Sequence, residues 1–120
     1  GADAAVQVLD ADFNVLAINR MAQREYERLW NRTLNPGDNL LRLFEDRPDI
    51  RDAMRRPWSR ALSGEAFVEV QIVGRDTDDP PAFEFRFSPL RSSDGAVIGA
   101  YVLAYDVTER LRDQARLLQA

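Results

Sequence analysis

Residues 83–110, with the sequence FEFRFSPLRSSDGAVIGAYVLAYDVTER, decide the fold of this chain. Aromatic and polar residues alternate over residues 83–90, which is the period of a strand with one buried face. Asp94 and Gly95 supply the positive φ that a tight reversal needs. The segment 97–107 is apolar on both faces, so both faces are expected to be covered. The stretch therefore predicts two long antiparallel strands.

A helix is expected to start directly after the second strand, at the sequence Asp106-Val107-Thr108-Glu109-Arg110. Asp106 or Thr108 can cap it, and Asp106 with Glu109 has capping-box spacing, with Asp in place of Ser or Thr. The run GAVIGAYVLAYDVTER resembles the last strand and exit motif of PAS domains, the sensory modules of bacterial histidine kinases and diguanylate cyclases. The resemblance implies a signal-transfer joint at Asp106, Thr108, Glu109 and Arg110.

The first half of the chain agrees with the PAS order. Residues 5–9 and 15–18 predict an opening hairpin. Asn19 then stands where the N-cap of a helix belongs, and an amphipathic pattern follows it. Residues 39–44 predict one or two further helical turns.

A longer helix is expected from Pro48 to the Ser63-Gly64 pair, with Gly64 near its C-terminal cap. Pro57 is expected to kink or split this helix. Its end, RALSGE, resembles the end of the long PAS helix. Residues 67–73 predict the third strand. The order predicts an α+β, PAS-like fold: a five-stranded antiparallel sheet with helices on one face and a C-terminal exit helix.

Length and composition indicate one domain over residues 1–120, with a core over about 5–107 and the start of a signalling helix at 108–120. The net charge of −4 disfavours nucleic-acid binding. No apolar run has the length of a membrane span. A chain that begins with Gly1 is expected to be a fragment of a larger protein.

The chain has no Cys and no His, which removes a thiolate nucleophile, the usual general base and the commonest metal ligands. PAS relatives that form a flavin adduct need a Cys, and haem-binding relatives commonly use a His. Ala104 also stands where flavin-binding relatives usually place Gln. The resemblance therefore implies neither cofactor, and an unidentified small organic ligand, or none, remains. Asp76, Asp78 and Asp79 lack calcium-loop spacing and predict a solvated loop, so no metal site is expected.

One sheet face is expected to form the core under the long helix. Its apolar strand positions are Val68, Val70, Ile72, Phe83, Phe85, Phe87, Ile98, Ala100, Val102 and Ala104. Ala100 and Ala104 are small opposite large rings, and Pro57 can lift the helix. We expect side chains to fill this space, with a small pocket as the alternative. The candidate lining residues are Met54, Trp58, Leu62, Val70, Ile72, Phe83, Phe85, Val102 and Ala104.

The opposite face of the last strand carries Tyr101, Leu103 and Tyr105, a contiguous apolar patch of the kind that marks an interface. We expect a homodimer through this patch. The alternatives are cover by a further N-terminal helix and a half-exposed strand whose Tyr hydroxyls reach water.

Three functions follow as hypotheses. The first is a PAS sensory and dimerisation module of a larger bacterial signalling protein, a sensor histidine kinase or diguanylate cyclase, with its effector after Ala120 and no catalysis of its own. The second is a ligand-free structural dimer module. The third is a small α+β enzyme with a cone-shaped pocket, which usually needs a His–Asp pair or a buried Asp with Tyr. The first implies a cytoplasmic domain, whose parent could be membrane-anchored.

Overall fold

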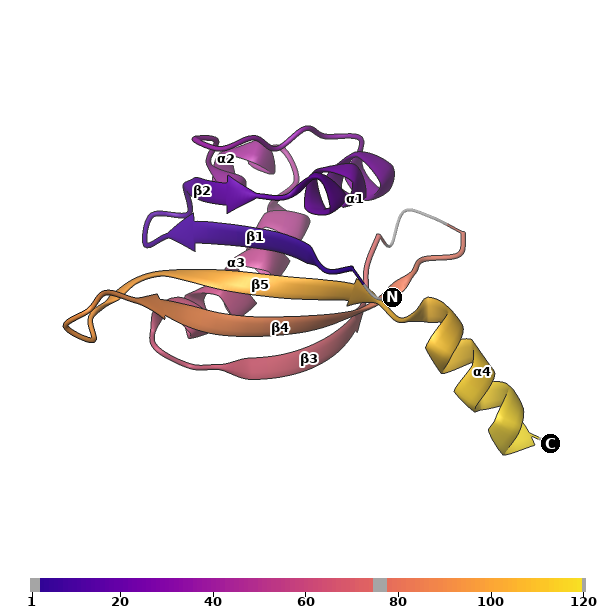
Figure 1. Ribbon diagram of the computed structural model, residues 1–120. Helices are drawn as coiled ribbons and strands as arrows, with labels where there is room; N and C mark the ends of the chain where they lie inside the picture. Colours follow the sequence, from indigo (N-terminus) through magenta and orange to yellow (C-terminus); the bar gives the residue numbers. More distant parts are fainter. Residues whose placement is uncertain (1–2, 75–77, 120) are drawn as a thin grey trace.

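The computed structural model describes residues 3–74 and 78–119 (Figure 1). Along this part of the chain the elements are β1 (Ala5–Asp10), β2 (Val15–Ile18), α1 (Arg20–Trp30), α2 (Leu40–Leu43), α3 (Pro48–Leu62), β3 (Phe67–Ile72), β4 (Ala82–Arg91), β5 (Val97–Asp106) and α4 (Thr108–Gln119). The strands form one antiparallel sheet in the order β2-β1-β5-β4-β3. The predicted α+β fold is confirmed.

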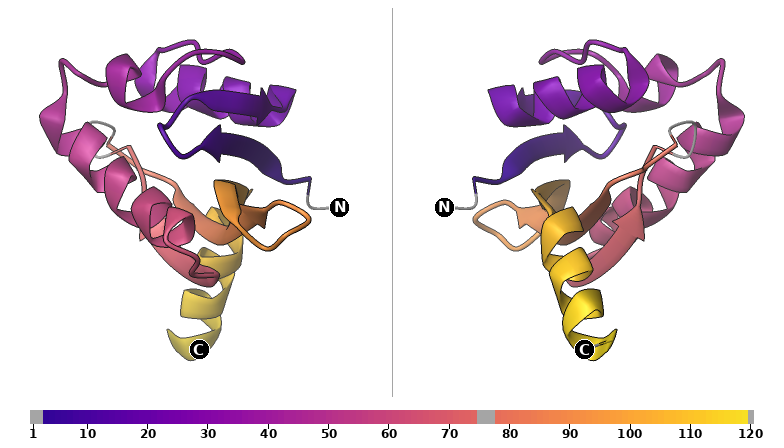
Figure 2. Two further views of the ribbon diagram at one scale, coloured as in Figure 1. Left: turned by 90° about the vertical axis from the view of Figure 1, so that its left-hand side faces the viewer. Right: turned by 90° about the vertical axis from the view of Figure 1, so that its right-hand side faces the viewer.

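Two layers enclose the core. Helix α3 crosses one face of the sheet, and α1 packs beside it against β1 (Figures 1 and 2). We call this face the inner face and the opposite one the outer face. Helix α4 leaves the end of β5 and points away from both layers (Figure 2).

The hairpin of β4 and β5 places large residues beside small ones on the inner face. Phe85 lies opposite Ala104, and Phe87 lies opposite Val102. The Trp58 ring of α3 meets Phe87 edge-on, with ring centroids 5.2 Å apart. Burying a ring of this size contributes about 1.5–3 kcal/mol, so these contacts hold α3 on the sheet.

Strand β3 faces the other way from the sequence prediction. Val68, Val70 and Ile72 are 60%, 49% and 57% exposed, so placing them on the core face was wrong. The register explains it: Glu69 lies opposite Phe85, and Val70 lies opposite Glu84.

A ring at the start of β3 determines this orientation. Phe67 stacks on Phe87 at 5.1 Å on the inner face, and the Arg60 guanidinium lies 3.7 Å from the Phe67 ring centre. Side chains alternate along a strand, so burying Phe67 turns the valines outward. An alternating pattern marks two faces and does not say which one is buried.

Ile98 was also expected in the core and is largely exposed. The register of β4 and β5 shifts between Leu90 and Arg91, and Ile98 lies at this irregularity near the hairpin end. The next residue, Gly99, lies so close to β1 that a Cβ atom would stand 2.3 Å from the Leu9 carbonyl oxygen. A side chain at this position is therefore excluded by the neighbouring backbone.

The N-cap prediction for α1 is confirmed, and the same residue fastens β1. The Asn19 Oδ1 atom accepts hydrogen bonds from the Ala22 N–H at 3.0 Å and from the Val6 N–H at 2.9 Å. Its Nδ2 group donates to the Ala4 carbonyl at 2.9 Å. One side chain therefore fixes the start of α1 to β1.

Helix α3 begins with Pro48 at its first turn, as expected, and Gly64 follows its end with φ +106°. Pro57 lies inside the helix, which continues through it, so the helix is not split at this residue. A buried group around α2, which the sequence patterns did not predict, extends the core and is formed by Leu9, Leu34, Leu40 and Phe44.

Candidate functional site

A cavity of about 270 Å³ lies between the inner face of the sheet and helices α1 and α3. The expectation that side chains fill this space was therefore wrong. Its lining is mostly apolar, with Trp30 and Met54 on the helices opposite Phe85 on the sheet. An apolar cavity with few polar groups is typical of a small-molecule site.

Most candidate lining residues border this cavity: Met54, Trp58, Ile72, Phe83, Phe85, Val102 and Ala104. Ile72 does so at the edge of the sheet with its side chain largely exposed. Val70 is on the outer face and does not reach the cavity, because β3 is turned as described above. Leu62 packs against the core beyond it.

Two polar side chains in the lining were missed from the sequence. Gln7 of β1 is 3% exposed, and the Tyr26 hydroxyl of α1 donates to its Oε1 atom at 2.7 Å. The Gln7 Nε2 group has no hydrogen-bond partner within the described part of the chain. Burial raises the pKa of the Tyr26 hydroxyl, which therefore stays neutral. A glutamine at an inward position of the apolar run AVQVL was the available signal.

Charged side chains at the edge of the cavity are arranged in pairs. Asp49 lies 3.3 Å from Arg47, whose hydrogen bond lowers the pKa of the Asp49 carboxyl. Glu25 accepts a hydrogen bond from Arg28 at 2.5 Å. This bond is the largest contribution that raises the pKa of Arg28. Neighbouring arginines therefore balance the negative charge of the Asp49 and Glu25 carboxylates on this edge.

The exit joint begins one turn further along α1. Arg28 Nη2 lies 3.4 Å from Asp106 Oδ2, while Asp106 Oδ1 accepts from the Thr108 N–H at 3.0 Å and from its hydroxyl at 2.6 Å. Burial alone would raise the pKa of Asp106, but the hydrogen bonds from Thr108 and the charge of Arg28 lower it. The Ala82 N–H donates to the Thr108 hydroxyl oxygen at 2.9 Å. Asp106 is therefore the acceptor at which α1, β5 and α4 meet.

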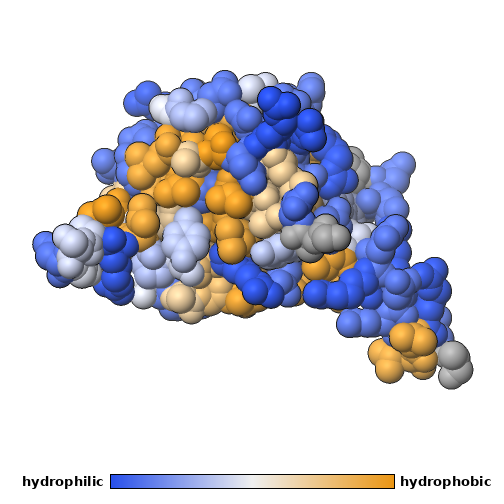
Figure 3. All heavy atoms as spheres, in the orientation of Figure 1, coloured by the Kyte–Doolittle hydropathy of each residue, from blue (hydrophilic) through white to orange (hydrophobic). Residues whose placement is uncertain are grey.

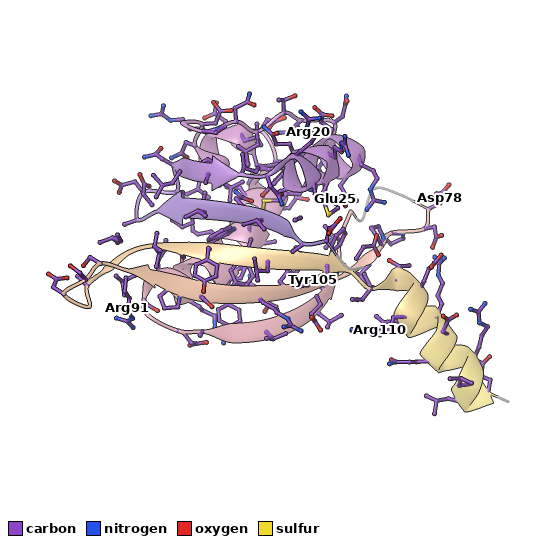
Figure 4. All side chains as sticks on the ribbon, viewed as in Figure 1. Arg20, Glu25, Asp78, Arg91, Tyr105 and Arg110 are labelled. Atoms are coloured by element: carbon purple, nitrogen blue, oxygen red, sulfur yellow. The ribbon has the colours of Figure 1, made fainter. Side chains whose placement is uncertain are left out.

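The other two joint residues lie on the first turn of α4. Arg110 is 3.6 Å from Glu84 of β4, and Glu109 is exposed in the first turn, where the helix dipole favours negative charge. Figure 4 labels Arg110 on this turn and Tyr105 near the end of β5. The structure thus brings all four joint residues together around the start of α4.

The outer face carries the expected apolar side chains of β5, and further apolar side chains lie on β3, across Glu84 and Arg86 of β4. Tyr101, Leu103 and Tyr105 are half-buried, and β3 adds the exposed Val68 and Val70. Hydrophobic residues gather over the strands on this side of the molecule (Figure 3). The Arg86 guanidinium lies 5.5 Å from the Tyr105 ring centre. We call these five apolar residues the outer patch.

Helix α4 has no buried residue within its described length. Its apolar positions Leu111, Ala115 and Leu118 recur at spacings of four and three, the seam of a coiled coil. The acidic loop before β4 is tied to this helix, because Arg112 donates to both carboxylate oxygens of Asp79 at 2.7 and 2.8 Å. Asp76, the first acid of that loop, lies outside the described residues.

Across residues 3–74 and 78–119 there is no group of three or more His, Cys, Asp or Glu side chains arranged to hold a metal ion. None of the helices in this part of the chain is long and apolar enough to cross a membrane.

Solved structures share this architecture. The chain is similar to a sensory box sensor histidine kinase from Vibrio cholerae (TM-score 0.59, 21% identity, 88% of this chain and 81% of the other). It is also similar to the PAS domain of BvgS from Bordetella pertussis (0.66, 20%, 97% and 88%). A third similar structure is the N-terminal domain of a diguanylate cyclase with a PAS/PAC sensor from Marinobacter aquaeolei (0.60, 11%, 90% and 98%).

No curated protein matches the chain significantly in sequence. The family model described as PAS fold matches residues 1–112, which include the sheet, the cavity and the exit joint. The sequence resemblance and the solved structures agree with this match, and the chain belongs to the PAS fold family of sensory domains.

Proposed function

We propose that this domain senses a small organic ligand in the cavity and passes the signal through α4 to an effector. The observation that carries the proposal is the continuous contact from cavity to exit helix: Glu25 borders the cavity and binds Arg28, which reaches Asp106. A ligand that moves Glu25 changes the position available to Arg28. Asp106, the cap of α4, then loses or gains one of its partners.

The mechanism is a shift between two arrangements of α4. Because Asp106 accepts from both Thr108 and Arg28, the start of α4 follows the position of α1. A ligand shifts such an equilibrium only by its difference in affinity for the two arrangements. Contact with Glu25 provides that difference, since this side chain borders the cavity and pairs with Arg28, which contacts the joint at Asp106.

The parent protein that we propose is a sensor histidine kinase or a diguanylate cyclase, with the effector following Ala120, a residue outside the described part of the chain. In this proposal the domain is cytoplasmic and binds and transmits without catalysing a reaction. The ligand is a small organic molecule and not a flavin adduct or haem, since the chain has no Cys and no His to hold them.

A second copy of the domain is the partner that we propose for the outer patch. Tyr101, Leu103 and Tyr105 of β5 share the outer face with Val68 and Val70 of β3, and the ion pair between Arg86 and Glu84 of β4 lies between the two apolar groups. A helix of the length of α4 is only marginally stable alone, and none of its described residues is buried. Pairing of two copies covers the patch and lets the two α4 helices run together.

Native and denaturing mass spectrometry of the purified domain test the sensory proposal. The native mass is expected to exceed the denatured mass by one small molecule. Ala104→Leu fills the cavity from β5 and is expected to abolish the extra mass, while Ala17→Leu, on the exposed side of β2, keeps it. A wild-type domain that is always empty, and that no small molecule stabilises, would favour the ligand-free structural module.

A further inference from the structure

One buried amide indicates the chemistry of the ligand in the proposed function. Gln7 projects from β1 into the cavity lining, and its Oε1 atom is occupied by the Tyr26 hydroxyl. Its Nε2 group has no partner within the described residues. Buried amide hydrogens almost always have an acceptor, so an oxygen or nitrogen atom of a bound molecule is expected beside Nε2.

The size of the cavity sets the size of that molecule. An apolar cavity of about 150 Å³ holds one benzene ring, and this one has about 270 Å³. It therefore accommodates a fused two-ring system. Trp30, Trp58 and Phe85 are in the lining, and aromatic walls favour a flat aromatic ligand through stacked or edge-on contacts.

The charges around the cavity exclude an anionic group at Gln7. The polar pair of Gln7 and Tyr26 is uncharged, and the carboxylates of Glu25 and Glu69 are among the lining groups. The guanidinium groups in and beside the lining are already engaged: Arg47 with Asp49 at 3.3 Å, Arg28 with Glu25, and Arg60 with Glu69 at 3.9 Å. A carboxylate buried at Gln7 would have to compete with these ion pairs for a cation and would be strongly disfavoured.

We infer that the cavity selects a neutral, flat aromatic molecule of about two fused rings that presents one hydrogen-bond acceptor, a carbonyl oxygen or a ring nitrogen, to the Gln7 amide. The inference rests on the proposed sensory function and deepens it. Gln7 is then the residue that separates acceptor-bearing aromatic molecules from plain hydrocarbons of the same shape.

Three probes with the same ring system test this selectivity by isothermal titration calorimetry. They are 2-acetylnaphthalene, which is neutral with a carbonyl acceptor, 2-ethylnaphthalene, which has no acceptor, and 2-naphthoate, which is charged. The acetyl compound is expected to bind about 5- to 10-fold more tightly than the ethyl compound, the usual effect of one net hydrogen bond. The naphthoate is expected to bind most weakly of the three.

The double variant Gln7→Leu with Tyr26→Phe removes both polar partners and keeps their shape, a change that is often tolerated in a core. It is expected to bind the acetyl and ethyl compounds equally. Gln114→Leu, an exposed glutamine of α4 outside the cavity lining, is the control and keeps the preference. Loss of the preference in this control as well would overturn the assignment to Gln7.

The outcomes separate this inference from the sensory function. Equal binding of the acetyl and ethyl compounds, or preference for naphthoate, overturns the inference and leaves a ligand-binding cavity. Binding of none of the probes to a domain that still co-purifies with another molecule also overturns it. Binding of no probe by a domain that is empty when purified overturns the inference and the proposed function together.

Discussion

Arg28 of α1 lies 3.4 Å from Asp106, the last residue of β5 and the cap of α4. Their side chains are 49% and 44% exposed, so the pair is well solvated. Such pairs contribute about 0–1 kcal/mol to stability. The contact therefore matters for position, because it joins the helix that borders the cavity to the helix that leaves the domain.

Replacing Arg28 with Ala is expected to uncouple ligand binding from the conformation of α4. The free energy of unfolding should change by less than about 1 kcal/mol, because the lost pair is exposed. Hydrogen exchange of residues 108–119 should respond to ligand in the wild type and become insensitive to it in the variant. Arg24→Ala, an exposed change on the same helix, is the control. A ligand response that survives Arg28→Ala would show that the signal takes another route.

Asp106→Asn tests the charge of the cap. The pKa of Asp106 is lowered in the folded domain, so ionised Asp106 stabilises the fold above the ordinary carboxyl pKa of about 3.9. This contribution is lost as the pH falls through the folded pKa. The stability difference between wild type and variant should therefore be present at pH 6 and shrink toward pH 3, and after solvent screening it should not exceed about 1 kcal/mol. Urea unfolding measured across this range provides the comparison, and a difference that grows toward low pH contradicts it.

Gly99→Ala is expected to be the more damaging of two glycine replacements. Its Cβ would stand 2.3 Å from the Leu9 carbonyl oxygen, a backbone atom that cannot rotate away, so a loss of about 3 kcal/mol is expected. Gly37 has φ +91° and nothing within 4 Å of an added Cβ, so Gly37→Ala carries only backbone strain of about 1 kcal/mol. Thermal unfolding of both variants checks the order, and equal losses would mean that β1 and β5 can separate freely.

Leu103→Arg tests the outer patch as the contact between two copies. The side chain lies on the outer face, so the domain should remain folded while the dimer dissociates, because a buried unpaired charge is costly. Sedimentation velocity at several concentrations measures the change. Leu16→Arg places the same charge at an exposed site of β2, outside the patch, and should leave the association unchanged. A wild type that remains monomeric at high concentration argues against the proposed pairing.

The hairpin of β4 and β5 was predictable because its signals are local. Alternation from Phe83 to Phe87, the turn at Asp94 and Gly95, and the capping motif at Asp106 each depend on neighbouring residues. The PAS resemblance rested on the same stretch and gave the fold correctly.

The orientation of β3 and the cavity were not predictable in this way. Whether Val70 or Glu69 faces inward depends on the contact between Phe67 and Phe87, which are far apart in the chain. The volume of the cavity depends on how closely α1 and α3 approach the sheet. Gln7 became a candidate only when its burial and its contact with Tyr26 were known.

The three hydrogen bonds of Asn19 have a consequence for the path by which a ligand enters the cavity. They connect the start of α1 to β1 through Val6 and to the preceding residue Ala4. The hydrogen bond between Tyr26 and Gln7 connects α1 to β1 a second time, inside the cavity lining. Helix α3 is held on the sheet mainly by packing of rings such as Trp58, and its Arg60 side chain also pairs with Glu69 of β3 at 3.9 Å. A ligand is therefore expected to enter the cavity between α3 and the sheet, while α1 keeps its position on β1.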